Sequence, residues 1–139
     1  MDTRTMDVSE ADYLTLAAFR AALRKFLRTS EEIAHGLDLT PQKHQAMLAV
    51  RGFPGDAPPT IGELAAKLHV RHNSAVGLIT RIEKEGYVKR EKSKVDQRRM
   101  HVRLTPKGHA LLDKLTEAHR TELRHIGPEI TRLLKELTR

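Results

Sequence analysis

Four consecutive residues, Arg71, His72, Asn73 and Ser74, carry side chains suited to reading the edges of base pairs. A guanidinium, an imidazole, a carboxamide and a hydroxyl together provide both hydrogen-bond donors and acceptors. In the major groove of DNA the four base pairs differ only in their donor and acceptor pattern and in the thymine methyl group. These residues therefore predict a nucleic-acid contact if they stand at the front of an exposed helix, with Arg71 or Asn73 at a base edge.

A second polar stretch, KSKVDQRRMHVRLTPKG over residues 92–108, surrounds one aspartate with many cations. Lys94 and Arg99 are of the type that attracts phosphates without regard to sequence. An anion approaching phosphates would be counterproductive, so Asp96 is expected to hold Arg98 or a neighbouring arginine through a charge-assisted hydrogen bond. The alternative is a flexible basic loop whose charges are interchangeable.

The excess positive charge of the chain, +7 over 139 residues, lies in one region. Residues 60–108 contain 12 Lys and Arg against 5 Asp and Glu, whereas the remaining residues hold 13 of each sign. A local surplus of this kind is the pattern of a basic footprint for a polyanion.

Composition argues against several other classes of protein. The absence of cysteine excludes disulfides, thiol redox sensing and cysteine zinc sites. No apolar run approaches the ~18 residues of a membrane span, and MDTRTMD lacks the regions of a signal peptide, so we expect a cytoplasmic protein with no membrane partner. No nucleophile elbow or glycine-rich phosphate loop is present, so neither an enzyme nor a cofactor is expected.

Two short helices are expected to position the first group of residues. The segment TIGE at 60–63 is a capping-box signature that predicts a helix to about Leu68. A break at 69–72 leads into a helix ending at Gly86, which gives a helix-turn-helix without the usual glycine in its turn. The apolar face of the second helix consists of Ala75, Leu78, Ile79 and Ile82, and the polar face of Asn73, Gly77, Thr80 and Lys84, with Arg81 beside it.

The basic stretch is expected to form the tip and returning strand of a β-hairpin. Residues 87–91 and 100–104 alternate in polarity and are separated by the polar segment 92–99. Thr105 and Pro106 then suit the cap and first turn of another helix. A hairpin joined to a helix-turn-helix predicts a winged lobe.

Long helices are expected on both sides of this lobe. SEAD at 9–12 predicts one helix start, and Thr40–Pro41 predicts another helix that runs to about Gly52. Gly127–Pro128 predicts that the C-terminal third divides into helices from about Pro106 to Ile126 and from Pro128 onward. The two apolar stripes are Leu16, Phe19, Leu23, Phe26, Ser30, Ile33 and Leu37, and Leu112, Leu115, His119, Leu123, Ile126, Ile130, Leu133 and Leu137.

These stripes are expected to pack against each other and against a second copy of the chain, because a chain this short offers them few other neighbours. A charge in the stripe, such as Leu133→Asp, is then expected to weaken DNA binding without touching the basic segment. The alternative is an ordinary monomeric core.

Residues 61–90 and 96–108 together resemble the MarR family of winged helix-turn-helix transcriptional regulators. Asp96, Arg98, Leu104, Thr105 and Gly108 occupy the family's wing pattern. The resemblance implies a mainly α fold with a small β-hairpin wing. It divides the chain into a helical dimerisation region, 1–39 and 106–139, and a DNA-binding lobe, 40–105.

The resemblance also implies a homodimer that binds a pseudo-palindromic site on double-stranded DNA. Its two recognition helices would enter successive major grooves, and each wing would reach an adjacent minor groove. In that setting Arg98 is expected to enter a narrow A·T-rich minor groove, whose negative potential attracts a guanidinium. Ser74 and Arg81 are assigned to phosphates. The expected DNA-binding residues are Arg71, His72, Asn73, Ser74, Gly77, Arg81, Lys94, Arg98 and Arg99.

Control by a small organic effector, such as an aromatic acid that releases a repressor from DNA, rests mainly on the same resemblance. The residues that line the effector site are suggested by their positions on the first two long helices. The expected ligand-binding residues are Phe19, Leu23, His44, Met47 and Leu48.

Two alternatives remain open. Net charge alone would also fit an architectural protein that binds DNA without regard to sequence. A metal-responsive regulator would use His119, Glu122 and His125, which follow at helical spacings of three, or the pair His69 and His72. His119 also falls on the apolar stripe, where a packed histidine is the commoner explanation.

Overall fold

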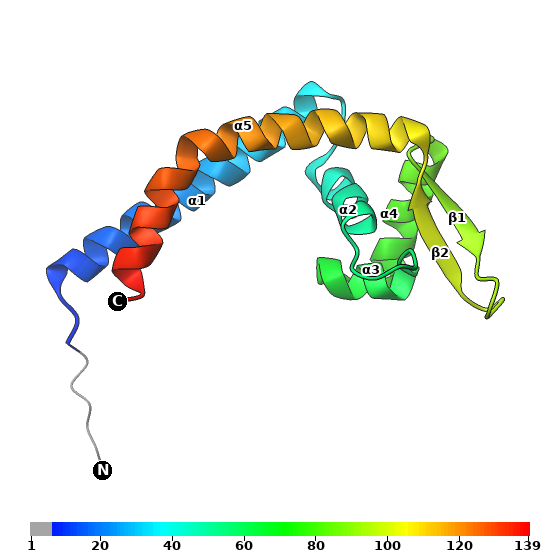
Figure 1. The fold of residues 1–139 in the computed structure, drawn as a ribbon, viewed down its shortest axis with the longest axis horizontal. Coiled ribbons are helices and arrows are strands. Elements are labelled where there is room, and N and C mark those ends of the chain that lie inside the picture. The colour runs from blue at the N-terminus through cyan, green and yellow to red at the C-terminus, as the bar shows by residue number, and fades with distance from the viewer. Residues whose placement is uncertain (1–6) are drawn as a thin grey trace, which may run out of the picture.

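A computed structural model of the protein describes residues 7–139; the first six residues of the expected dimerisation region lie outside this range. Five helices and one hairpin follow in the order predicted for a mainly α winged fold (Figure 1). None of the helices within the described residues is long and apolar enough to cross a bilayer. The elements are α1 Glu10–Gly36, α2 Pro41–Arg51, α3 Ile61–Leu68, α4 His72–Lys84, β1 Val88–Lys92, β2 Met100–Leu104 and α5 Pro106–Leu137.

Side-chain caps fix the starts of four helices where the sequence predicts them. Ser9 and Thr60 form complete capping boxes with Asp12 and Glu63. Each hydroxyl accepts a backbone N–H of the first turn, and each carboxylate accepts the backbone N–H of the cap residue. Thr40 and Thr105 cap α2 and α5 through the hydroxyl alone, which accepts the backbone N–H of Lys43 and of Gly108, and each is followed by a proline in the first turn.

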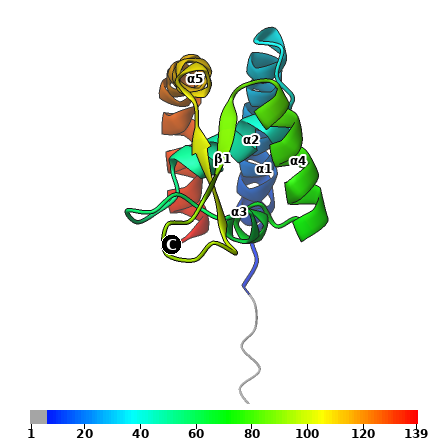
Figure 2. The ribbon, with the colours of Figure 1, turned by 90° about the vertical axis from the view of Figure 1, so that its right-hand side faces the viewer.

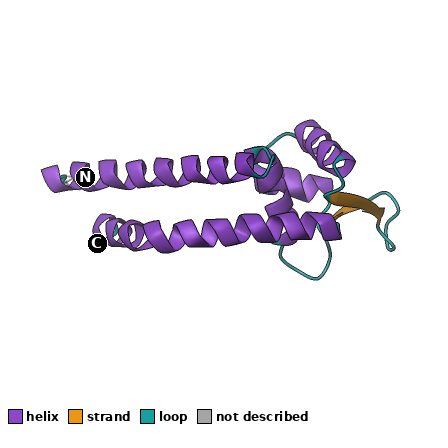
Figure 3. Cartoon of the chain, turned by 90° about the horizontal axis from the view of Figure 1, so that it is seen from above, coloured by secondary structure: helices purple, strands orange, loops and turns teal. Residues whose placement is uncertain are grey.

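The two long helices α1 and α5 run side by side and antiparallel, so that the start of α1 and the end of α5 lie at the same end of the molecule (Figure 3). Ala22 of α1 and Ile126 and Leu133 of α5 are buried between them. Phe19, Phe26 and Ile130 complete this small cluster. Only part of the two apolar stripes therefore packs together as expected. Leu16, Leu23 and Leu123 are exposed, and Leu112 and Leu115 belong to the core of the winged lobe.

The predicted division of α5 at Gly127–Pro128 is wrong, because one helix continues through Pro128. Proline in a helix interior costs about 3 kcal/mol by removing one hydrogen bond and crowding the preceding turn. Ile126 before it and Leu133 after it are both buried against α1, and each such side chain contributes about 1.5–3 kcal/mol. Burial on both sides offsets the local cost, and Figure 1 shows α5 as one ribbon that bends toward its C-terminal end.

The core of the winged lobe is formed by α2, α3, α4, the hairpin, the first turns of α5 and the end of α1 with Leu39. The predicted apolar face of α4 is confirmed, since Ala75, Leu78, Ile79 and Ile82 are all buried in it. Val102 of β2 is fully buried as well. The two strands pair antiparallel, with Val88 opposite Leu104 and Lys92 opposite Met100. This core holds the polar face of α4 and the hairpin in a fixed relation.

Candidate nucleic-acid interface

The turn between α3 and α4 explains how a helix-turn-helix forms here without glycine. His69 adopts the left-handed conformation, with φ 55° and ψ 42°, in the place where glycine usually ends a helix. The backbone N–H of Val70 donates to the carbonyl of Ala65 at 3.1 Å and closes the end of α3. The imidazole itself is exposed.

The four residues at the front of α4 are all exposed, as a reading surface requires. Arg71 is the N-cap, and no side chain caps this end of the helix. The first N–H groups of α4 therefore remain available to phosphate oxygens, which the helix dipole favours. Further along, Arg81 is exposed and Gly77 is half-buried. A Cβ at Gly77 would meet only the end of the Arg81 side chain, at 3.6 Å, so intramolecular packing does not demand glycine there.

The hairpin tip is an ordered turn that presents Lys94, Arg98 and Arg99 to solvent. The Ser93 hydroxyl accepts the backbone N–H groups of Val95 and Asp96, each at 3.2 Å. The backbone N–H of Ser93 donates to the Arg99 carbonyl at 2.9 Å and closes the turn.

The partner expected for Asp96 needs correction. Its carboxylate accepts the backbone N–H of Arg98 at 3.1 Å and pairs with no guanidinium among the described residues. The physical reason is that the backbone N–H of Arg98 is only two residues away, and an aspartate in a turn readily accepts such an N–H. Asp96 thus shapes the backbone that carries Arg98 and leaves the arginine side chain free to reach outward.

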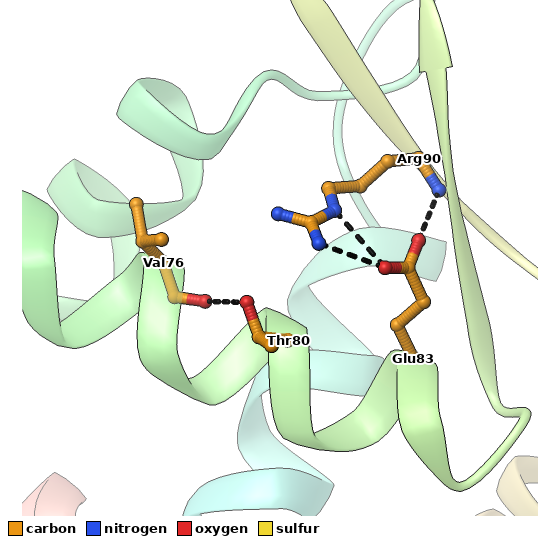
Figure 4. A network of polar contacts seen from close by, with 4 residues as sticks. All are labelled: Val76, Thr80, Glu83 and Arg90. Carbon is orange, nitrogen blue, oxygen red and sulfur yellow. Dashed lines mark hydrogen bonds and ion pairs between the residues drawn. The ribbon is translucent and has the colours of Figure 1, made fainter.

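An ion pair that sequence reasoning missed joins α4 to the wing (Figure 4). Glu83 accepts the backbone N–H of Arg90 at 3.0 Å, its Nε at 3.2 Å and its Nη2 at 2.8 Å. Hydrogen bonding from Arg90 lowers the pKa of Glu83, against the opposing effect of burial. The only signal in the sequence is an acid and a base seven residues apart, on either side of the turn at Gly86. This spacing is too common to predict an ion pair.

Every acidic residue of the basic segment 60–108 has an intramolecular partner. Glu63 caps α3, Glu83 holds Arg90, and Asp96 shapes the wing tip. The other two acids form ion pairs, Glu85 with Lys43 and Glu91 with Arg103, the latter at 2.9 Å. Lys89 and Arg103 of the wing are exposed but share Glu91. The other exposed cations of α4 and the wing form no ion pair among the described residues; they are Arg81, Lys84, Lys92, Lys94, Arg98 and Arg99, with Arg71 at the cap of α4.

The base of the wing is fixed to α5 at a single crowded point. The Thr105 hydroxyl donates to the Gly86 carbonyl at 2.5 Å and accepts the Gly108 N–H at 3.0 Å. The backbone N–H of Thr105 donates to the Tyr87 carbonyl at 3.0 Å. A Cβ at Gly108 would lie 2.1 Å from that same carbonyl oxygen, so only glycine fits.

The five residues expected to line an effector site lie in different surroundings within the described chain. Phe19 belongs to the cluster between α1 and α5, whereas Met47 is fully buried in the core of the winged lobe. Leu23 and Leu48 are exposed on different helices. Their shared role stays a prediction.

The fifth of these residues, His44, packs against His119 where α2 meets α5. The ring centroids are 4.8 Å apart. The Nδ1 of His119 lies 2.6 Å from the Leu115 carbonyl, and its Nε2 lies 2.6 Å from the Ser30 hydroxyl. Both nitrogens are thus engaged, which fits the packed role of this histidine better than a ligand set with Glu122 and His125. No group of three potential metal ligands occurs within residues 7–139.

Burial lowers the pKa of His44, and the neighbouring His119 lowers that pKa further. In the unfolded chain His44 titrates at the ordinary value, near 6.5. As the pH falls through that value, the unfolded state takes up a proton that the folded state resists, so the free energy of unfolding decreases until the lowered folded pKa is reached. We expect this residue to make the protein less stable at about pH 5.5 than at about pH 7.5.

Urea unfolding of the parent and of His44→Phe at both pH values checks this expectation, with the exposed His35→Gln as the matched control. The His44 variant should show a smaller pH dependence than either of the other two proteins. An unchanged pH dependence in His44→Phe would contradict the assignment.

The sequence and the fold were compared with those of known proteins. A sequence model of the MarR family matches residues 37–99, which contain α2, α3, α4, β1 and the wing tip. The winged lobe of the chain is similar to the MarR family. A curated protein similar to this chain, the HTH-type transcriptional regulator YkoM of Bacillus subtilis, is 28% identical over 102 residues. The match covers 73% of the chain and 62% of YkoM, so the chain spans less than two thirds of that relative's length.

Solved structures confirm the winged helix-turn-helix fold of this chain. A MarR family protein from Bacillus stearothermophilus superposes with a TM-score of 0.74 at 21% identity, over 95% of this chain and 99% of that one. A MepR variant of Staphylococcus aureus, bound to an oligodeoxyribonucleotide, superposes with a TM-score of 0.68 at 20% identity, over 94% of this chain and 100% of that one.

Proposed function

We propose that the protein is a sequence-specific regulator of transcription that binds double-stranded DNA as a homodimer and acts as a repressor. The observation that carries this proposal is the charge arrangement of the winged lobe. All five acids of residues 60–108 are engaged within the chain, while the cations of α4 and the wing that form no ion pair among the described residues face solvent. The DNA complex of the structurally similar MepR variant supports the same use of the fold.

The proposed roles follow from where the side chains lie. Arg71 or Asn73, exposed at the front of α4, reads a base edge in the major groove. Ser74 and Arg81 bind phosphates and set the register of the helix. Arg98, carried on the turn that Asp96 shapes, enters the minor groove.

The proposed second copy of the chain covers apolar residues that α1 and α5 leave exposed. Those of α1 recur at steps of three, four and seven, on a stripe beside the face that packs on α5. The exposed apolar residues concerned are Tyr13, Leu16, Leu23 and Leu27 of α1, and Leu123 and Leu134 of α5. This arrangement supports the division into a dimerisation region and a DNA-binding lobe.

Leu133 does not test this interface, contrary to the expectation from sequence. It is only 2% exposed, because it is already packed within one chain between α5 and α1. A charge at that position would disrupt the fold of the single chain before it could report on a dimer.

Release from DNA by a small organic effector completes the proposal. Such a ligand lowers operator affinity only if it binds better to a conformer in which the two α4 helices have the wrong spacing. A ligand with equal affinity for both conformers would leave DNA binding unchanged.

Selection of bound duplexes from a random DNA pool tests the function. We expect enrichment of an inverted repeat whose half-site centres lie about 10 base pairs apart, because a two-fold dimer presents its α4 helices to successive major grooves. A pool that shows binding without enrichment would instead indicate an architectural protein.

Replacing Arg98 with lysine should weaken operator binding although the charge is kept. The planar guanidinium fits a narrow minor groove in a way that an ammonium cannot. We expect about a tenfold loss of affinity and a weaker preference for A·T pairs beside the half-sites, and a smaller loss for Asp96→Ala, which removes the acceptor of the Arg98 N–H.

Operator titrations over a salt series provide the measurement. Lys94→Gln serves as the control, because the loss of a simple phosphate contact should mainly reduce the salt slope by about one. If Arg98→Lys binds like the parent and Asp96→Ala binds more tightly, the wing is only an electrostatic patch.

A further inference from the structure

The wing is attached to the rest of the lobe along both of its strands. On the side of β2, the backbone N–H of Val102 donates to the Pro59 carbonyl at 2.9 Å. On the side of β1, Glu83 of α4 accepts three hydrogen bonds from Arg90. In the view of Figure 2 the hairpin accordingly lies between α4 and the loop 53–59.

The contact on the side of α4 holds the strand itself as well as an arginine side chain. Oε2 of Glu83 accepts the backbone N–H of Arg90 at 3.0 Å, and Oε1 accepts its Nε and Nη2 (Figure 4). The backbone N–H is an edge group of the two-stranded sheet, because its partner lies outside the sheet. Rotation of the arginine side chain alone therefore cannot release the strand.

This contact fixes the wing at the middle of β1 rather than at its base. Arg90 is the third of the five residues of β1, and Glu83 lies in the last turn of α4. The base of the wing is fixed separately, at Thr105 and Gly108. Within residues 7–139 no other side-chain hydrogen bond or ion pair joins α4 to the hairpin. The distance between α4 and the wing therefore depends on Glu83.

The position of this carboxylate is not explained by stability or by charge. The side chains of Glu83 and Arg90 are 33% and 28% exposed, and ion pairs open to solvent to this extent contribute little to stability. Hydrogen bonding from Arg90 lowers the pKa of Glu83, so the carboxylate is ionised at neutral pH. An anion on a surface that faces phosphates also weakens the attraction to DNA.

From this geometry we infer that Glu83 is a positioning residue for the wing. It sets the distance between α4 and Arg98, and hence the number of base pairs between the edges read in the major groove and the A·T pairs reached in the minor groove. Two contacts held at the separation that DNA presents avoid the cost of ordering a loose wing on binding. This inference rests on the proposed function, in which both elements contact one half-site.

Removing the carboxylate should have opposite effects on two kinds of DNA. The freed Arg90 adds positive charge, which favours binding to any duplex and makes the salt slope steeper by up to about one. A loosened wing, in contrast, weakens binding only where the wing contact depends on sequence. Repulsion of phosphates by Glu83 alone would predict tighter binding to every duplex.

The variant Glu83→Ala tests the inference, and Glu91→Ala is the matched control. Both remove one negative charge, but Glu91 pairs with Lys89 and Arg103 inside the hairpin and not with α4. Affinities are measured for the duplex selected from the random pool and for a scrambled duplex. We expect both variants to bind the scrambled duplex more tightly than the parent does. The preference for the selected duplex should fall about tenfold in Glu83→Ala, comparable to the loss of one base contact, and stay unchanged in Glu91→Ala.

Two further measurements separate positioning from a general loss of structure. Alanine is favourable in a helix, so circular dichroism should show α4 intact in Glu83→Ala. Exchange of the Arg90 amide hydrogen in the DNA-free protein should be about tenfold faster in Glu83→Ala and unchanged in Glu91→Ala.

The inference is overturned if Glu83→Ala keeps the preference of the parent, or if Glu91→Ala loses it equally. Tighter binding of Glu83→Ala to both duplexes would overturn it as well and leave only a charge effect. A parent that shows no preference between the duplexes would instead refute the proposed function, and this role with it.

Discussion

Replacing Gly108 with alanine should lower the free energy of unfolding by about 3 kcal/mol, the upper part of the range for overpacking a well-filled site. The added Cβ would stand 2.1 Å from the Tyr87 carbonyl oxygen and 3.3 Å from the Leu104 side chain. Both the carbonyl and the first turn of α5 are backbone, so neither can rotate away. The junction between the wing and α5 must open instead, and it carries the hydrogen bond from Thr105 to Tyr87.

Gly127→Ala is the matched control, because it makes the same change in the same helix. A Cβ at Gly127 would meet nothing within 4 Å. Alanine there should stabilise the helix by up to about 1 kcal/mol, the difference in helix propensity. Urea unfolding of both variants is the measurement, and similar stability of the two would refute the close contact at Gly108.

Replacing Leu27 with aspartate should dissociate the dimer without unfolding the chain. Leu27 is 57% exposed in the single chain, so folding of the chain does not require it to be apolar. In the proposed dimer the same side chain is covered, and burying a carboxylate there is strongly unfavourable. We expect the dimer dissociation constant to rise by about 100-fold, equivalent to about 3 kcal/mol, with a parallel loss of operator affinity.

Sedimentation at micromolar concentration and circular dichroism check this pair of effects. Leu14→Asp provides the control, because Leu14 is 69% exposed on another face of α1. It should sediment as the parent does. If Leu27→Asp remains dimeric, or if the parent is a folded monomer, the apolar stripe of α1 is not the interface.

Local signals in the sequence were enough to predict most of the fold. Capping boxes at Ser9 and Thr60 mark helix starts because the hydrogen bonds involved lie within four residues. The apolar spacing of Ala75, Leu78 and Ile82 fixes which side of α4 is buried, and hence which side is offered to DNA. Both features depend only on neighbours along the chain.

Features that depend on contacts between distant elements were missed or mistaken. Pro128 reads as a helix break until the packing of Ile126 and Leu133 on α1 is known. The ion pair of Glu83 with Arg90 depends on how β1 returns past α4. Glycine is needed at position 108 because the Tyr87 carbonyl lies against it. The alternating polarity of the two strands does not predict where that carbonyl lies.

The central claim is sequence-specific binding of DNA by a dimer, and a competition titration at physiological salt tests it most directly. The duplex selected from the random pool would be compared with a scrambled duplex of the same length and composition. The proposed function predicts a preference of about 10³-fold or more for the selected duplex, with two chains bound to each. Equal affinity for the two duplexes, or one chain bound per selected duplex, would contradict it.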